Sequence, residues 1–277
     1  MPNSFERRRE ALGERLRELQ VAAGYEQGKD FARALGWNAP KVSKIANGRQ
    51  TASTEDIDAW LAAVSASPDV ADEVRTLHAA VLDAYVTWKD KVRTGHRARQ
   101  EESVTREGKA RVIRAFEIGA VPGLIQTADY ARCALTAHAE LHGGGHDIDD
   151  AVRARMKRQT ILFEPGREIE LLFSEAALLN PIAPPEVMRG QKHRLIATIG
   201  TPGVRVGIVP TGVKLPYPLL HNWWIIDDVV LMESATAEIV VDDPDEVEVY
   251  NKLTDMFWEV AVEGDAARDL LAGAAPS

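Results

Sequence analysis

The chain has 277 residues, more than the roughly 100 to 200 that one domain usually needs, so the sequence predicts two domains. A single cysteine excludes intrachain disulfides and multi-cysteine metal sites, and no apolar run reaches about 18 residues, so we expect no membrane segment and a cytoplasmic, nucleoid-associated protein. The net charge of −9 hides two basic tracts: residues 7–49 hold ten Lys/Arg against five Asp/Glu, and residues 89–114 hold nine against four.

Residues 1–66 are predicted to form an all-α domain of about five short helices. Leucines recur at spacings of three and four within residues 8–23, and Gly36 ends a second helix over 29–35. Asn38 is a good N-cap for a third helix, and Ser53 opens a fourth. The third helix is expected to end at Asn47-Gly48.

Residues 30–49 meet the physical requirements of a helix-turn-helix. Ala32 lets two helices approach closely, Gly36 permits the sharp turn, and Val42 and Ile45 anchor the second helix to the core. The opposite face of that helix is then left exposed for a major groove. It carries a polar and cationic row of Asn38, Lys41, Ser43 and Lys44.

Residues 10 to 65 resemble the Xre, or lambda-repressor-like, helix-turn-helix family. The matching positions are Ala32, Gly36, Val42, Ser43, Ile45, Asn47 and Gly48, while the loop 25–29 is one residue longer than usual. The resemblance implies a DNA interface in which Ala39, Pro40 and Lys44 face base edges. It implies phosphate contacts for Lys41, Ser43, Asn47, Arg49 and Gln50, with Gln27 and Lys29 at the start of the preceding helix.

Direct readout of bases by this helix is expected to be modest. Ala39 and Pro40 have no side-chain donor, so specificity depends on Lys44, on Asn38, on contacts with thymine methyl groups and on DNA shape. We therefore expect a homodimer on two half-sites about one helical turn apart. The alternative for this domain is a helical protein-protein module that binds no DNA.

Residues 67–111 are predicted to connect the two domains. An apolar stripe from Val70 through Tyr85 and Trp88 to Val92 predicts one long helix, and the basic run 93–111 predicts a solvated helix extension or linker. The complete layout is multi-domain, with the helix-turn-helix domain, this connecting helix, and a mixed α/β (α+β) regulatory domain over residues 112–277. Its expected strands are 112–116, 169–173, 204–209, 223–226, 229–232 and 238–241, and its expected helices 128–141, 149–162, 185–199 and 244–262.

The second domain, over residues 112 to 272, resembles the C-terminal domain of an actinobacterial regulator group that includes WhiJ-like proteins. The segments that carry the resemblance are 121–132, 174–178 and 207–210. It implies an antitoxin-like repressor or activator that responds to a small partner protein encoded nearby. Tyr217, Trp223 and Trp224 would anchor such a partner if exposed, with core packing of at least one tryptophan as the alternative. A small-molecule effector is the other mode of regulation.

No catalytic, metal or cofactor site is predicted. His138, His142 and His146 are spaced by four, but without the HExxH order a solvated helix end is favoured over a metal site. The nucleophile and phosphate-loop motifs GxSxG and GxxxxGK[ST] do not occur. The pairs Asp227-Asp228 and Asp242-Asp243 are typical of acidic turns at strand ends. We therefore predict that the protein is not an enzyme.

Overall fold

The computed structural model describes residues 4–87, 95–143 and 145–273. The chain divides into two compact units: an N-terminal one of residues 1–86, with which residues 239–241 are grouped, and a C-terminal one of residues 87–238 and 242–277. The predicted multi-domain layout, with a helical part followed by a mixed α/β part, is confirmed. In the described ranges no helix is long and apolar enough to cross a membrane.

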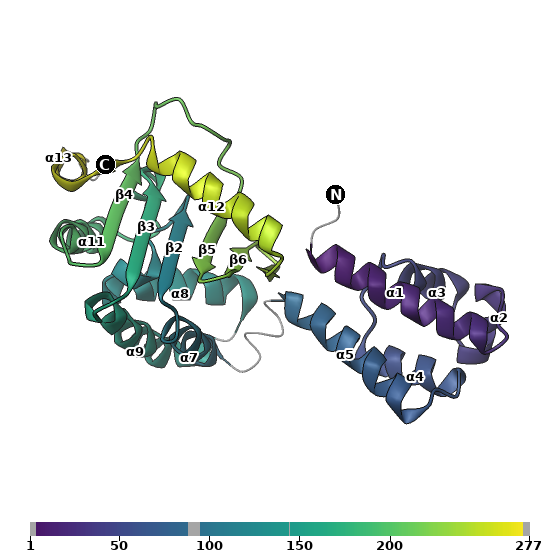
Figure 1. Cartoon of the computed structure of the whole chain (residues 1–277). Coiled ribbons are helices and arrows are strands. Elements are labelled where there is room, and N and C mark those ends of the chain that lie inside the picture. The colour runs from purple at the N-terminus through teal and green to yellow at the C-terminus, as the bar shows by residue number, and fades with distance from the viewer. Residues whose placement is uncertain (1–3, 88–94, 144, 274–277) are drawn as a thin grey trace. The chain divides into compact units, whose positions relative to one another are not determined.

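The N-terminal unit is a bundle of short helices around one apolar core. Trp60 is fully buried at its centre, where its ring meets Phe31 edge to face and its Nε1 donates to the Leu16 carbonyl at 3.0 Å. Ser53 and Asp56 form the capping box that the sequence predicts. The helices are α1 (Ser4–Ala22), α2 (Gly28–Leu35), α3 (Ala39–Ala46), α4 (Thr54–Ala63) and α5 (Pro68–Ala84), all labelled in Figure 1.

The expectation of one connecting helix through Val92 is wrong. Helix α5 ends at Ala84, and a short strand, β1 (Tyr85–Thr87), follows it. Val74 and Val81 bury the apolar stripe of α5 in the core of the N-terminal unit. The remaining positions of that stripe, 88 and 92, lie outside the described residues.

The basic run after this segment is not a solvated linker. It forms α7 (His96–Glu107), which packs along α9 (Ile148–Arg158) within the C-terminal unit. His96, Gln100 and Glu107 are buried on its inner face. The sequence prediction failed because polar and charged side chains occupy the positions where a helix usually carries apolar ones.

The core of the C-terminal unit is a mixed sheet in the order β7-β6-β5-β2-β3-β4-β8. Strands β2, β3 and β4 run parallel, whereas β5 is antiparallel to β2 and to β6, and β8 is antiparallel to β4. The strands are β2 (Val112–Glu117), β3 (Glu168–Ser174), β4 (Val204–Val209), β5 (Asn222–Ile226), β6 (Val229–Glu233), β7 (Ala237–Val241) and β8 (Val262–Glu263). All but β8 were expected from the sequence.

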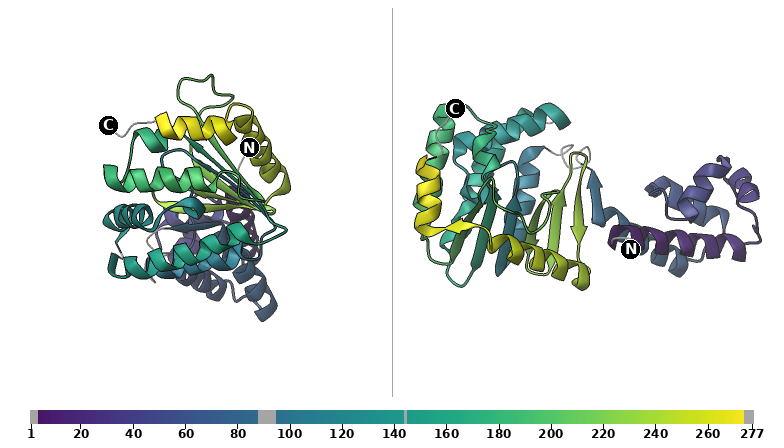
Figure 2. Two further views of the ribbon diagram at one scale, coloured as in Figure 1. Left: turned by 90° about the vertical axis from the view of Figure 1, so that its left-hand side faces the viewer. Right: turned by 90° about the horizontal axis from the view of Figure 1, so that it is seen from above.

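Helices cover both faces of this sheet. Helices α7, α8 (Ala128–His142), α9 and α11 (Pro185–Thr198) form a layer on one face, and α12 (Pro244–Trp258) crosses the other (Figures 1 and 2). Successive side chains of a strand therefore point to different layers. The short helix α10 (Ala176–Leu179) follows β3, and α13 (Gly264–Gly273), which the sequence did not predict, packs on α11.

Candidate nucleic-acid interface

Helices α2 and α3 form the helix-turn-helix that the sequence predicts. Gly36 takes a left-handed conformation, with φ of 68°, and turns the chain between the two helices. Ala32 is buried where the helices approach, and Val42 and Ile45 fix α3 to the core of the N-terminal unit. The outer face of α3 is consequently directed away from the core.

A close approach between α1 and α3 sets the position of α3. A Cβ atom on Gly13 would lie 2.7 Å from the Ile45 carbonyl oxygen, and one on Gly48 would lie 2.8 Å from Glu10 Cα. Both distances are too short for a side chain, so glycine is required on each side of the contact. Gly13 was not singled out from the sequence, although a glycine inside a helical pattern is itself a signal of close packing.

The first turn of α3 begins with an ordered cap. The Asn38 side chain accepts a hydrogen bond from the Lys41 backbone N–H at 2.8 Å, and Pro40 occupies the first turn without loss because that turn needs no N–H there. Asn38, Ala39 and Pro40 are exposed. The end of the helix that would enter a groove first is thus both fixed and accessible.

Most of the predicted DNA-binding residues are exposed on the N-terminal unit. Ser43 and Asn47 lie one turn apart on α3, and the Asn47 side chain donates to the Ser43 carbonyl at 2.7 Å. This bond orients the amide at the C-terminal end of α3. The exposed members of the predicted set are Gln27, Lys29, Asn38, Ala39, Pro40, Ser43, Lys44, Asn47 and Arg49, while Gln50 is half-buried.

Lys41 differs from the other predicted DNA contacts because its ammonium group already interacts with side chains of the N-terminal unit. Its ammonium group donates to Asp56 Oδ1 and lies 4.0 Å from the centre of the Trp37 ring. Asp56 is only 13 % exposed. Lys41 therefore ties α3 to the start of α4, and the phosphate contact expected for it stays a prediction.

Three predicted cations remain available for phosphate. Lys29, Lys44 and Arg49 are exposed, and no carboxylate of the described residues lies within 4.0 Å of their charged groups. Other basic residues of the unit are paired, such as Arg15 with Glu73 and Arg33 with Asp30. The accessible positive charge of the helix-turn-helix is concentrated at α2, α3 and the turn after α3.

Four arginines of the second basic tract, residues 89–114, are paired within the C-terminal unit. Arg99 pairs with Glu233, and Arg114 pairs with both Glu170 and Asp255. Arg97 and Arg106 pair with carboxylates one turn away on α7. The charges of these four arginines are therefore compensated inside the unit, whereas Lys109 and Arg111 are exposed and residues 89, 91 and 93 lie outside the described ranges.

The three predicted partner anchors do not form one surface. Trp223 is 2 % exposed, stacks on Phe116 and donates to Thr254 Oγ1 on α12. Trp224, the next residue of β5, points to the other face of the sheet and donates to Glu117 at 2.8 Å. Only Tyr217 is exposed, so core packing is the correct alternative for Trp223.

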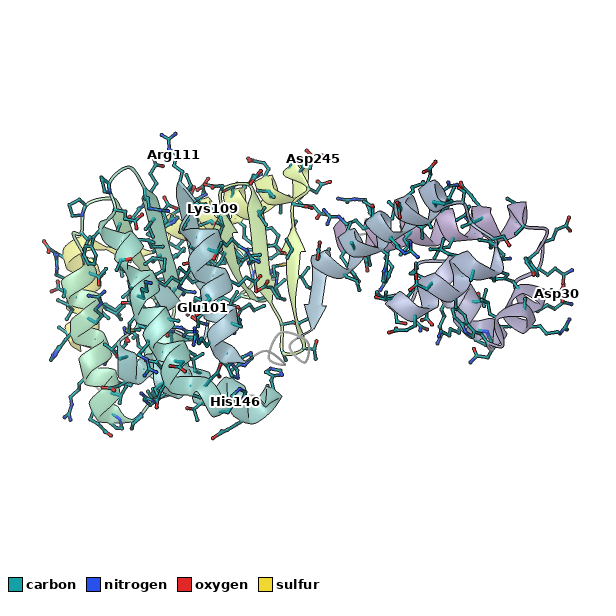
Figure 3. The ribbon with its side chains drawn as sticks, turned by 90° about the horizontal axis from the view of Figure 1, so that it is seen from below. Asp30, Glu101, Lys109, Arg111, His146 and Asp245 are labelled. Carbon is teal, nitrogen blue, oxygen red and sulfur yellow. The ribbon has the colours of Figure 1, made fainter. Side chains whose placement is uncertain are left out.

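The histidine cluster and the aspartate pairs singled out in the sequence lie at helix ends and turns. His138 and His142 lie 4.4 Å apart by ring centres on α8, and His146 follows near the start of α9 (Figure 3). Across the described parts of the chain, no three His, Cys, Asp or Glu side chains are placed to hold a metal ion. Asp227 accepts two backbone N–H groups beside β2, and Asp243 caps α12. Both carboxylates thus have roles in shaping turns.

Comparison with known proteins identifies both parts of the chain. Residues 100–273 match the family described as "Domain of unknown function (DUF5753)", and residues 11–74 match one described as "Helix-turn-helix domain". A comparison with curated proteins found no match. Among solved structures, the chain is similar to TrmBL2, an archaeal chromatin protein whose structure is described as showing a novel mode of DNA binding. The identity is 12 %, the TM-score is 0.34, and the match covers 76 % of this chain and 69 % of that one.

A TM-score this low carries no conclusion about function. The two family matches do not depend on it, and their ranges follow the two units of the structure. The first of them spans well over half of the chain. The protein therefore belongs to the DUF5753 family, with a helix-turn-helix domain in front of the domain that defines the family.

Proposed function

We propose that the protein is a sequence-specific DNA-binding transcriptional regulator in which α3 enters the major groove of duplex DNA. The helix-turn-helix domain supports a DNA-binding regulator in general. The observation that carries the proposal is the outer face of α3, which is exposed, capped by Asn38 and flanked by the uncompensated charges of Lys29, Lys44 and Arg49. Such a face matches the needs of groove entry and phosphate contact.

Each exposed residue has a role that follows from its chemistry. Lys44 reads a base edge, while Ala39 and Pro40 make apolar contacts with thymine methyl groups. Polar and cationic groups around them bind phosphates and set the register of α3 on the duplex. The proposed phosphate contacts are Gln27, Lys29, Ser43, Asn47, Arg49 and Gln50, and Lys41 contributes by holding α3 to α4 through Asp56.

The protein acts as a homodimer in this proposal. A single α3 offers one long donor side chain, Lys44, toward the bases, which gives little discrimination from one half-site. Two copies on half-sites about 34 to 36 Å apart multiply that discrimination. Analytical ultracentrifugation of the full chain with and without a palindromic duplex tests this point, and tight specific binding by a strict monomer contradicts it.

The C-terminal unit receives the regulatory signal. A signal changes DNA affinity only if it binds the competent and incompetent states of the protein with different affinity. The resemblance to antitoxin-like regulators supports a small partner protein, and Tyr217 remains as an exposed anchor for it. A charged cavity in this unit favours the second candidate, a small-molecule effector.

Genome-wide capture of DNA bound to the tagged protein tests the proposed function. We expect enrichment at a few sites that share a palindromic motif, and loss of that enrichment in Lys44→Ala. Lys252→Ala is the matched control, because Lys252 is also exposed with no carboxylate of the described residues within 4.0 Å, but lies on α12. Enrichment without any common motif, or equal enrichment in both variants, contradicts sequence-specific binding through α3. Mass spectrometry of co-purified material tests the partner protein.

A further inference from the structure

The C-terminal unit contains a partly open cavity of about 200 Å³ whose walls are rich in charge. It lies between strands β2, β5, β6 and β7 and the helices α7, α8 and α9. Helix α7 contributes one full side to it, including Arg99, Gln100 and Arg106. Glu101 lies on the outer side of the same helix (Figure 3).

Most charges in the cavity wall are compensated by a partner in the same wall. Glu107 lies 3.3 Å from Arg158, and both side chains are buried. Arg99 pairs with Glu233. Arg106 likewise lies 3.6 Å from Glu238, which is only 6 % exposed. Each of these three arginines thus has a carboxylate partner within 4.0 Å.

Arg155 is the exception among these cations. Its Nε donates to Gln100 Oε1 at 3.0 Å and its Nη1 donates to Gln126 Oε1 at 2.6 Å, so two neutral amides hold the guanidinium in place. Within the described ranges no carboxylate lies within 4.0 Å of it. Burial, and then repulsion from Arg158 and Arg99, lowers the pKa of Arg155 to about 9, so it remains charged at neutral pH. A half-buried cation without a carboxylate partner is costly, and a bound anion relieves that cost.

Glu117 stands in the same cavity and adds no negative charge at neutral pH. Its Oε1 accepts a hydrogen bond from Trp224 Nε1 at 2.8 Å. Burial, and then the charge of Glu233, raises the pKa of Glu117 to about 8. The carboxyl group is therefore protonated near pH 7 and offers an O–H donor to a ligand.

Charge, size and wall chemistry together define the ligand class. One uncompensated guanidinium matches one negative charge, and a guanidinium binds a carboxylate through two parallel hydrogen bonds. The cavity volume of about 200 Å³ lies below the roughly 300 to 1,000 Å³ of sites for drug-sized ligands, so the ligand is small. Leu135, Trp224 and Leu231 supply an apolar wall for a carbon skeleton.

We propose that this cavity binds a small organic monocarboxylate, with its carboxylate on Arg155 and its carbon skeleton against Leu135, Trp224 and Leu231. This proposal rests on the proposed function in one respect only: the bound ligand acts as an effector if the protein is a DNA-binding regulator. Binding itself needs no DNA. Failure of ligand binding and failure of DNA binding are thus separate results.

Isothermal titration of the full chain with benzoate, without DNA and at fixed ionic strength, tests the proposal. We expect saturable binding of one benzoate per chain. Benzamide, which has the same ring without the charge, is expected to bind at least tenfold more weakly, and so is inorganic phosphate. No saturable heat with millimolar benzoate, or equal affinity for benzamide, overturns the proposal, and tighter binding of phosphate overturns the carboxylate assignment.

Three variants locate the binding. Arg155→Gln is expected to weaken benzoate binding at least tenfold, whereas Arg153→Gln on the outer side of α9 changes it less than twofold. Ala134→Leu adds volume inside the cavity without changing charge, so it should also abolish binding, and it carries the test alone if Arg155→Gln fails to fold. Unchanged affinity in a folded Arg155→Gln or Ala134→Leu protein contradicts a site in this cavity.

Discussion

The ammonium group of Lys41 is held between the carboxylate of Asp56 and the face of the Trp37 ring, so a cation of the recognition helix secures that helix to α4. The pair joins residues 15 positions apart and reaches the capping box of α4, because Asp56 also accepts the Ser53 backbone N–H. Lys41 and Lys44 therefore have separable roles. One orients α3, and the other is available to DNA.

Lys41→Met is expected to lower the free energy of unfolding by about 1 kcal/mol, the sum of a partly buried ion pair and a cation–π contact. Lys44→Ala should leave stability unchanged within about 0.5 kcal/mol, because Lys44 is exposed. Urea unfolding of both variants measures this difference. A destabilised Lys44→Ala beside an unaffected Lys41→Met contradicts the assignment.

The contact between α1 and α3 predicts a second effect on the position of the recognition helix. Gly13→Ala places a Cβ 2.7 Å from the Ile45 carbonyl oxygen, which forces α3 to shift and should cost about 1 to 3 kcal/mol of stability. DNA affinity should fall as well, measured on folded protein. Val21→Ala, at an exposed position of the same helix, is the control and should change neither quantity. Wild-type stability in Gly13→Ala contradicts the close approach.

Arg114 joins the sheet to α12 through several partners at once. Its Nε donates to Glu170 at 2.6 Å and its Nη1 to Asn251 at 3.0 Å, and it also pairs with Asp255. Arg114→Met leaves the Glu170 carboxylate without this partner, so we expect a loss of about 3 kcal/mol in thermal or urea unfolding. Arg111→Met is the control, since Arg111 extends outward from the start of β2 (Figure 3). Equal stability of the two variants contradicts this account.

The raised pKa of Glu117 predicts a pH dependence with a definite sign. The unfolded chain loses this proton near the ordinary glutamate pKa of about 4.5, but in the folded protein burial, and then the charge of Glu233, raises the pKa of Glu117 to about 8. Folding stability from this group therefore falls as pH rises from 4.5 to 8 and is constant above. The melting temperature of Glu117→Gln relative to wild type should rise across that window. A difference that is independent of pH contradicts the assignment, and Glu248→Gln, at an exposed site, is the control.

Local sequence patterns predicted the regular elements well because those elements are encoded locally. The Asn38 cap, the Ser53 capping box and the strand over 204–209 depend on residues a few positions apart. Strand periodicity also indicates that Trp223 and Trp224 cannot anchor the same partner. Neighbouring residues of a strand point to opposite faces of the sheet.

Contacts between residues far apart in the sequence could not be predicted from local patterns. Helix α7 looks solvated because it is highly charged, yet its partners Glu233 and Glu238 lie more than 130 residues further along the chain. The Lys41 to Asp56 contact is likewise a product of tertiary folding. Composition gives the charges, but only the fold shows which ones are compensated.

The most direct measurement for the central claim is fluorescence anisotropy of a labelled duplex from the region upstream of the protein's own coding sequence, titrated with wild type, Lys44→Ala and Lys252→Ala. The account predicts tight wild-type binding that resists unrelated competitor DNA. Lys44→Ala should lose about 1 to 3 kcal/mol of binding free energy, and Lys252→Ala should match wild type. Failure of wild type to bind any duplex at low ionic strength, or equal affinity of all three proteins, would contradict DNA binding through α3.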